Sequence, residues 1–228
     1  MPATLHAITM DAHDPGRLTA FWADVLGWRA EGHELVPEPP ARFRIRFLPG
    51  REEKWGGNQA HFDLTSESAE AMAATIERAL AAGGRHIDVG QTPEEGHAVL
   101  ADPEGNELCV LPPGNRFLAG CGLLGGVSCD GSRDCGLFWA AALDWPLVWD
   151  QDEETAIQHP EGGAKIAWGG PPHDPKHGLN PVRFELHAPS GEYDAELARL
   201  LDLGARWEGT WLVDPDGHEL SLLPAPMT

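Results

Sequence analysis

Hydrophobic and polar residues alternate in short runs along much of the chain. In residues 42–48 phenylalanine and isoleucine alternate with arginine, which is typical of a strand with one apolar and one basic face. In residues 17–26 the apolar residues recur at helical spacing instead, and Gly27 follows where a left-handed cap would end the helix. The pattern therefore predicts short strands interrupted by a few amphipathic helices.

The predicted elements occur twice in the same order within residues 5–112. The first series consists of a strand at 5–12, a helix at 17–26 and three strands around 28–31, 34–37 and 42–48. The second series consists of a strand at 59–65, a helix at 68–82 and strands near 86–89, 97–101 and 107–111. This order predicts two modules, each made of a strand, a helix and three further strands.

The second half of the chain repeats the first. Residues 101–112, ADPEGNELCVLP, return as residues 213–224, VDPDGHELSLLP, with seven of twelve positions identical. Each copy combines the turn chemistry of Asp-Pro-acid-Gly with an alternating run, which predicts a turn that leads into a half-buried strand. A linker rich in proline and glycine lies at 112–120. We therefore expect two domains, residues 1–115 and 116–228, with two modules in each.

Composition and charge narrow the classes of partner. The 228 residues carry a net charge of −20, with 16 basic and 36 acidic side chains. Nucleic acids and anionic membranes need basic patches, so we expect neither as a partner. The N-terminus lacks the pattern of a signal peptide, and no stretch approaches the roughly 18 apolar residues of a membrane span. We expect a cytoplasmic protein whose four cysteines are free thiols.

Several motifs together resemble a known superfamily. They are Asp14-Pro15, Phe21-Trp22, Leu26-Gly27-Trp28, His61-Phe62-Asp63-Leu64 and Asp102-Pro103-Glu104-Gly105-Asn106. With these motifs the chain resembles the vicinal oxygen chelate superfamily, specifically its glyoxalase-like and bleomycin-resistance-like proteins. The resemblance implies an α+β fold in which four strand-helix-three-strand modules form two incomplete barrels, each around a cavity. It does not by itself imply one activity, because one fold hosts many.

Metal-dependent members of this superfamily take His, Glu or Gln ligands from the first and last strands of two modules. His6, His61 and Glu107 look like such a set, and they would suit a metal-dependent lyase, isomerase or dioxygenase. In the register that the resemblance implies, however, the ligand positions are Ala7 and Cys109. His6 would then face the helix, and only His61 stays in frame. A bulge that turns His6 inward is the alternative.

The remaining ligand positions also argue against a cation. Arg46 stands where the last strand of the first module would supply a ligand, and a guanidinium repels a divalent cation. In the second half, Arg183, Ala167 and Ser221 occupy the corresponding positions. We therefore predict no metal and no other cofactor.

Polar residues of the strands are the candidates for contact with a ligand. In the first half they are Asp11, Arg44 or Arg46, His61, Asp63, Glu107 and Cys109, and in the second half Lys165, Arg183, Glu185, Glu219 and Ser221. His61 is the candidate acid-base residue because the ordinary pKa of histidine lies near neutrality. A buried, satisfied network is the alternative role for His61. Cys109 as a nucleophile would need a base such as His61 within reach.

These observations favour a metal-independent, glyoxalase-like small-molecule-binding protein, which could sequester a ligand or a drug. The alternatives are the metal-dependent enzyme that uses His6, His61 and Glu107, a metal-free lyase that uses His61, and a scaffold whose second half only pairs with the first. Proteins with a single pair of modules commonly dimerise, and the tandem repeat could satisfy that contact within one chain. A monomer and a homodimer both remain open, as does the question of whether each cavity forms within one half or across the two.

Overall fold

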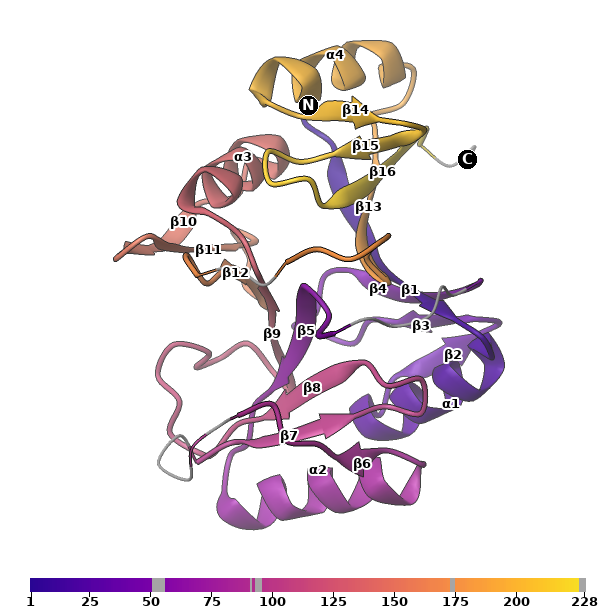
Figure 1. Ribbon diagram of the computed structural model, residues 1–228, viewed down its shortest axis with the longest axis vertical. Coiled ribbons are helices and arrows are strands. Elements are labelled where there is room, and N and C mark those ends of the chain that lie inside the picture. The colour runs from indigo at the N-terminus through magenta and orange to yellow at the C-terminus, as the bar shows by residue number, and fades with distance from the viewer. Residues whose placement is uncertain (51–55, 91, 93–95, 173–174, 226–228) are drawn as a thin grey trace.

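Four copies of one module follow one another along the chain (Figure 1). The computed structural model describes residues 1–50, 56–90, 92, 96–172 and 175–225, and these residues form four α-helices and two eight-stranded sheets. Each module is a strand, a helix and three further strands, as the alternation of residues predicts. The α+β fold class is confirmed, and neither sheet closes into a complete barrel.

The modules of the first half contain the following elements. Module 1 consists of β1 (Thr4–Ala12), α1 (Pro15–Leu26), β2 (Arg29–Glu31), β3 (Glu34–Val36) and β4 (Arg44–Pro49). Module 2 consists of β5 (Ala60–Leu64), α2 (Ala69–Ala81), β6 (Arg85–His86), β7 (Ala98–Ala101) and β8 (Glu107–Val110).

The modules of the second half have the same order. Module 3 consists of β9 (Leu124–Cys129), α3 (Arg133–Leu143), β10 (Leu147–Gln151), β11 (Glu154–Gln158) and β12 (Lys165–Trp168). Module 4 consists of β13 (Val182–His187), α4 (Tyr193–Leu203), β14 (Arg206–Glu208), β15 (Trp211–Val213) and β16 (Glu219–Leu223).

The two sheets join modules from different halves of the chain. Sheet A has the strand order β14-β15-β16-β13-β1-β4-β3-β2, so it combines modules 1 and 4. Sheet B has the order β10-β11-β12-β9-β5-β8-β7-β6, so it combines modules 2 and 3. Antiparallel pairs, β1 with β13 and β5 with β9, connect the halves. Each polar face of a sheet is therefore built by both halves of the chain.

Helix ends follow the local sequence. Asp14 Oδ1 accepts a hydrogen bond from the Arg17 backbone N at 3.0 Å, and Pro15 occupies the first helical position of α1. The helix ends at Gly27, whose φ of 72° is left-handed. In α3 the equivalent cap is Asp144, with a φ of 55°. Among the described residues, every helix is too short or too polar to cross a bilayer.

The repeated Asp-Pro turn ties together the two modules of each half. Asp102 accepts a hydrogen bond from Trp22 Nε1 of α1 at 3.1 Å, and Asp214 accepts one from Trp139 Nε1 of α3 at 3.0 Å. Both aspartates are fully buried, and each also accepts backbone N–H groups of its own turn. The turns thus hold module 2 to α1 and module 4 to α3, while the sheets join the halves to each other.

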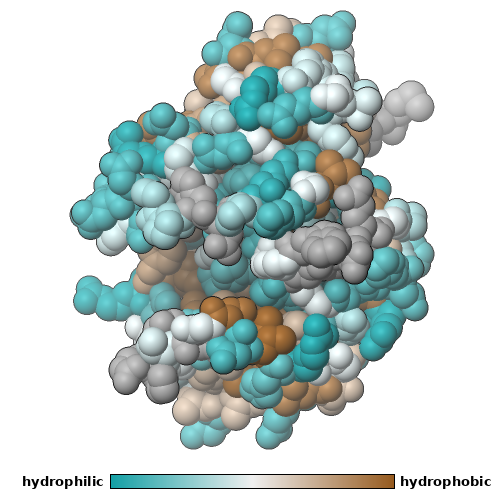
Figure 2. Space-filling view, viewed as in Figure 1, coloured by the Kyte–Doolittle hydropathy of each residue, from teal (hydrophilic) through white to brown (hydrophobic). Residues whose placement is uncertain are grey.

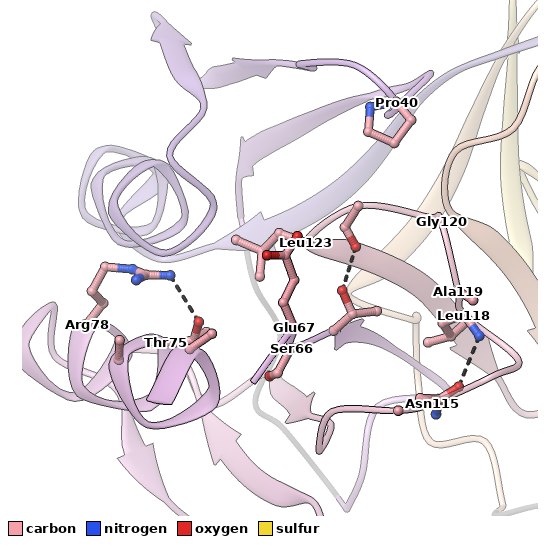
Figure 3. A pocket seen from close by; sticks show the side chains of 15 residues that line it. Pro40, Ser66, Glu67, Thr75, Arg78, Asn115, Leu118, Ala119, Gly120 and Leu123 are labelled. Carbon is pink, nitrogen blue, oxygen red and sulfur yellow. Dashed lines mark hydrogen bonds between the residues drawn. The ribbon is translucent and has the colours of Figure 1, made fainter. Parts of the chain in front are cut away.

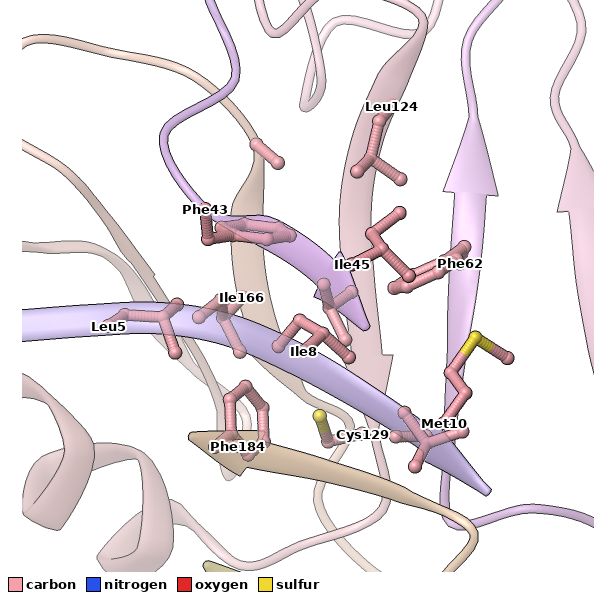
Figure 4. Packing of buried hydrophobic residues seen from close by; sticks show 14 of the residues in the cluster. Leu5, Ile8, Met10, Phe43, Ile45, Phe62, Leu124, Cys129, Ile166 and Phe184 are labelled. Atoms are coloured by element: carbon pink, nitrogen blue, oxygen red, sulfur yellow. The ribbon is translucent and has the colours of Figure 1, made fainter. Parts of the chain in front are cut away.

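Apolar side chains of both sheets meet in one core (Figure 4). Ile8 and Ile45 of sheet A and Phe62, Leu124 and Ile166 of sheet B belong to this core, and each is at most 2% exposed. Because side chains alternate along a strand, the residues between these point to the opposite face of their sheet. The charged and polar candidates collect on those opposite faces.

Candidate functional site

The polar face of sheet B carries a small cluster of functional groups. His61 and Asp63 lie on β5, Cys109 on β8 and Ser128 on β9, in neighbouring strands. Strand alternation buries the residues on either side of His61 in the core and leaves His61 and Asp63 on the other face, as the sequence predicts. We call these four residues the histidine face.

Distances within the histidine face allow direct contact. His61 Nε2 lies 3.6 Å from Asp63 Oδ1, and Ser128 Oγ donates a hydrogen bond of 2.5 Å to Asp63 Oδ2. One ligand atom each of His61, Asp63 and Cys109 lie within 4.8 Å of one another. The side chains of His61 and Asp63 are 33% and 14% exposed, so solvent or a ligand can reach the imidazole.

The environment of His61 decides its protonation. Burial lowers the pKa of His61, but hydrogen bonds and charge from Asp63 and Cys109 outweigh burial and raise this pKa to about 10. The imidazole is therefore an imidazolium at neutral pH. It can donate a proton, whereas the role of general base near neutrality that its ordinary pKa suggested is not available to it.

The proton on His61 also affects metal binding. The fold family includes metal-dependent members, so this site must be tested for an ion. His61, Asp63 and Cys109 are close enough to surround one ion. A metal takes neutral imidazole and thiolate, so binding near neutral pH must displace the proton that Asp63 and Cys109 hold on His61. Asp63 is also already engaged by Ser128. This donor set could therefore hold a divalent cation only in competition with the proton on His61 and with the Ser128 hydrogen bond.

The polar face of sheet A has a different chemistry. Arg46 Nη1 donates to both carboxylate oxygens of Glu185, at 2.7 and 2.5 Å. Arg183 donates to the two oxygens of Asp11, at 2.7 and 2.6 Å. The register pairs Thr9 of β1 with Arg183 of β13 and with Arg46 of β4, which places both guanidiniums in one row. We call Asp11, Arg46, Arg183 and Glu185 the arginine face.

The arginine face does not fit a divalent cation. Its two carboxylates are each engaged by a guanidinium, and both arginines keep their charge at any physiological pH. Arg183 is 5% exposed, and its guanidinium also lies over the ring of Trp211, 4.9 Å from the centroid. Closed pairs of this kind hold strands in register rather than leave ligand positions open.

His6 differs from its expected position. The pairing of β1 with β13 contains a bulge between Leu5 and Ala7, and His6 occupies it. Its ring stacks on His187 with centroids 3.9 Å apart, beside Glu185. The expectation that His6 faces the helix is therefore wrong, because one extra residue turns it to the polar face. Burial, followed by the neighbouring His187, lowers the pKa of His6.

The structure also separates residues that we expected to act together. His6 lies in sheet A, while His61 and Glu107 lie in sheet B, so the proposed set of three metal ligands does not form. In the same way, Asp11 and the arginines of β4 are in sheet A, apart from the histidine face. The expected first-half cavity is thus wrong in its membership, because the modules pair across the halves.

The other predicted residues have structural partners. Arg44 pairs with Glu34 at 3.2 Å, and the backbone N of Asn58 donates to Glu107 at 3.2 Å. Glu219 pairs with Lys176 at 2.6 Å. Ser221 lies on β16 in register with Glu185, and Lys165 Nζ donates to the backbone O of Phe117. None of these residues takes part in the contacts that define the histidine face or the arginine face.

Ser128 is the functional residue that the sequence analysis missed. None of the candidate residues chosen from the sequence lies on β9. The strand extends to Cys129, and its register places Ser128 opposite His61. The signal that could have found it is strand alternation, because the apolar Val127 and Cys129 stand on either side of Ser128.

A third group of possible ligands is structural. Cys135 Sγ lies 3.1 Å from Asp214 Oδ2, and His218 Nδ1 lies 3.5 Å from the same oxygen, which also receives the Trp139 hydrogen bond. Burial raises the pKa of Asp214, but His218 and the hydrogen bonds outweigh burial and lower it. Asp214 holds the Asp-Pro turn against α3 through these hydrogen bonds. The contacts of Cys135 and His218 with it are therefore structural.

The surface agrees with the composition. Hydrophilic residues cover most of the face shown in Figure 2, and apolar residues are divided among smaller patches, a prominent one of which lies in its lower half. With a net charge of −20, such a surface offers little to a polyanion.

Comparisons with known proteins agree on the fold. A model described as a glyoxalase-like domain matches residues 7–111 and again residues 126–223. The crystal structure of glyoxalase I from Zea mays is similar with a TM-score of 0.62 at 14% identity, covering 97% of this chain and 92% of that one. A protein of Bacillus subtilis subsp. subtilis described as a candidate dioxygenase has a TM-score of 0.60 at 14% identity, covering 99% of this chain and 86% of that one.

At this identity the two solved structures support the fold alone. A search of curated proteins found no match. The family model, in contrast, covers most of the chain in two consecutive copies. The chain therefore belongs to the glyoxalase-like family and has the vicinal oxygen chelate fold with two tandem domains.

Proposed function

We propose that this protein binds a small polar molecule at the histidine face without a resident metal ion. The observation that carries the proposal is the geometry of the histidine face, in which His61 Nε2 lies 3.6 Å from Asp63 Oδ1 and one ligand atom each of His61, Asp63 and Cys109 lie within 4.8 Å of one another. The raised pKa of His61 agrees with this geometry and favours an imidazolium. Such a group offers a charged hydrogen-bond donor next to acceptors, within reach of solvent. Sequestration of a ligand or drug would require nothing beyond this binding.

The arrangement of the two faces supports binding without a metal. Of the three residues expected to form a ligand set, His6 lies in the other sheet from His61 and Glu107, and the carboxylates of the arginine face are engaged by its own arginines. A metal-dependent lyase, isomerase or dioxygenase that uses His6, His61 and Glu107 has no geometric support in this fold.

A metal-free enzyme is the second candidate. One observation favours it: a protonated His61, within 4.8 Å of Asp63 and Cys109, could deliver a proton to a bound substrate. Catalysis would then depend on His61 as the acid. The His61→Gln substitution would abolish turnover while leaving binding partly intact, and it thereby separates this candidate from simple binding.

The experiment combines metal analysis with a ligand screen. Protein purified without added ions is analysed for zinc, iron, nickel and manganese, and is then screened by thermal shift against glutathione conjugates, aromatic diols and basic antibiotics. We expect much less than one ion per chain. We also expect a ligand that raises the Tm of the wild type and of Ser221→Ala, but not of Asp63→Asn. A near-stoichiometric metal that disappears in His61→Gln would overturn the proposal.

We infer a monomer from the same pairing of modules. The β1–β13 and β5–β9 seams are formed within one chain, and this supports a monomer. Sedimentation equilibrium tests it, since a stable homodimer would contradict the inference.

A further inference from the structure

A separate pocket lies between α2 and the linker that joins the halves (Figure 3). Its volume is 490 Å³, within the range of small-molecule sites. Helix α2, the segment that follows β5, the linker and Pro40 of the loop between β3 and β4 all contribute to its wall. None of the residues of the histidine face or the arginine face lines it.

Small side chains create this volume. Ala71, Ala74, Thr75 and Arg78 recur at helical spacing and present one face of α2 to the pocket. Opposite them residues 114–122 contribute three glycines and Ala119, together with Leu118. Leu118 is only 4% exposed, so its packed side chain forms an apolar part of the pocket wall.

Three polar groups in the pocket have hydrogen-bonding capacity to spare. Ser66 Oγ is buried and has no hydrogen-bond partner among the described residues. Glu67 and Arg78 make no ion pair within the described part of the chain, and the hydrogen bonds of Arg78 use only Nη2, to Thr75 Oγ1 at 3.0 Å and to the Val25 carbonyl. In Figure 3 the Arg78 guanidinium extends from α2 toward the side on which Ser66 and Glu67 lie.

The other polar groups of the pocket are already satisfied. Thr65 Oγ1 donates to the Gly122 carbonyl at 2.7 Å, and Asn115 Oδ1 accepts from the Leu118 backbone N at 3.0 Å. These bonds hold the linker against the end of β5. Hydrogen bonds therefore fix one wall of the pocket in place. Three groups can still bind a ligand: the Arg78 guanidinium, the Glu67 carboxylate and the Ser66 hydroxyl.

We propose that this linker pocket binds a small zwitterion of amino-acid size with an apolar side chain. Arg78 and the Ser66 hydroxyl donate hydrogen bonds to its carboxylate, and Glu67 accepts from its ammonium group. Its apolar side chain packs on Leu118 and Leu123. This site is independent of the function proposed for the histidine face.

The test uses L-leucine and two analogues that each lack one charged group, 4-methylpentanoate and isopentylamine. Calorimetric titration of the wild-type protein should show saturable binding of L-leucine. Each analogue should bind roughly ten-fold or more weakly, because it loses one charge-assisted contact. No binding of L-leucine, or equal binding of an analogue, would overturn the proposal without recourse to any variant.

Variants then locate the site. Ala74→Trp fills the pocket and should abolish binding of L-leucine, whereas Ala73→Trp, a matched change at an exposed neighbour that does not line the pocket, should leave it unchanged. His61→Gln should also bind normally, so failure of the function proposed for the histidine face and failure of this pocket give different results. Binding that survives Ala74→Trp, or that His61→Gln removes, would contradict the assignment.

Discussion

The two polar faces of this protein hold equivalent strands of the repeat but opposite kinds of chemistry. Arg183 occupies in module 4 the position that His61 occupies in module 2, and each lies beside an aspartate. On the arginine face the two cations are guanidiniums, which are permanently charged, and each makes two hydrogen bonds to its carboxylate. On the histidine face the cation exists only through a proton that its neighbours hold. One face therefore suits stabilisation, and the other suits binding and proton transfer.

The largest expected effect comes from breaking the arginine face. Arg183→Met should lower the free energy of unfolding by about 3 kcal/mol, because it leaves Asp11 largely buried and unpaired. Urea unfolding measures this loss. The double variant with Asp11→Asn should recover part of it, since the uncompensated charge is then removed. A loss well under 1 kcal/mol for Arg183→Met would show that the two faces do not differ in this way.

The pH dependence of the histidine face is the next test. The pKa of His61 is about 10 in the folded protein against an ordinary 6.5, so its contribution to stability is complete below pH 6.5 and disappears as the pH rises through about 10. NMR titration should find this high pKa in the wild type and a pKa much nearer the ordinary value in Asp63→Asn. Equal pKa values of His61 in the wild type and in Asp63→Asn would exclude Asp63 as the cause of the raised pKa.

A smaller effect is expected from Ser128. Ser128→Ala removes one hydrogen bond to Asp63 and should cost about 1 kcal/mol of unfolding free energy. The His61 imidazolium should persist, because Asp63 and Cys109 remain. Chemical unfolding and the same NMR titration check the two statements. If His61 lost its proton at neutral pH in this variant, the serine rather than the carboxylate would control the face.

The smallest effect is expected for the Arg44–Glu34 pair between β4 and β3 of sheet A. Arg44 pairs with Glu34 across the sheet, but both side chains are about 30% exposed. Arg44→Ala should therefore change the free energy of unfolding by less than about 1 kcal/mol. Urea unfolding beside Arg183→Met gives the contrast directly. A loss as large as that of Arg183→Met would mean that exposure does not separate the two arginines.

Much of the fold could be predicted because its signals are local. Strand alternation and helical spacing depend on residues two to four apart, and the repeated Asp-Pro turns marked the ends of the modules. The same alternation correctly placed His61 and Asp63 together on one face of β5. Membership of the two clusters was harder to predict, because Asp11 and His61 belong to the same half of the chain but to different sheets.

By itself, the sequence determined the four modules, their order and the facing of most strand residues, since each of these is set by neighbours along the chain. Only the tertiary structure decided that module 1 pairs with module 4 and module 2 with module 3. It also decided that a single bulged residue turns His6 toward His187. Both outcomes depend on hydrogen bonds between strands about 60 or more residues apart, and the hydrophobic pattern of one strand carries no information about its distant partner.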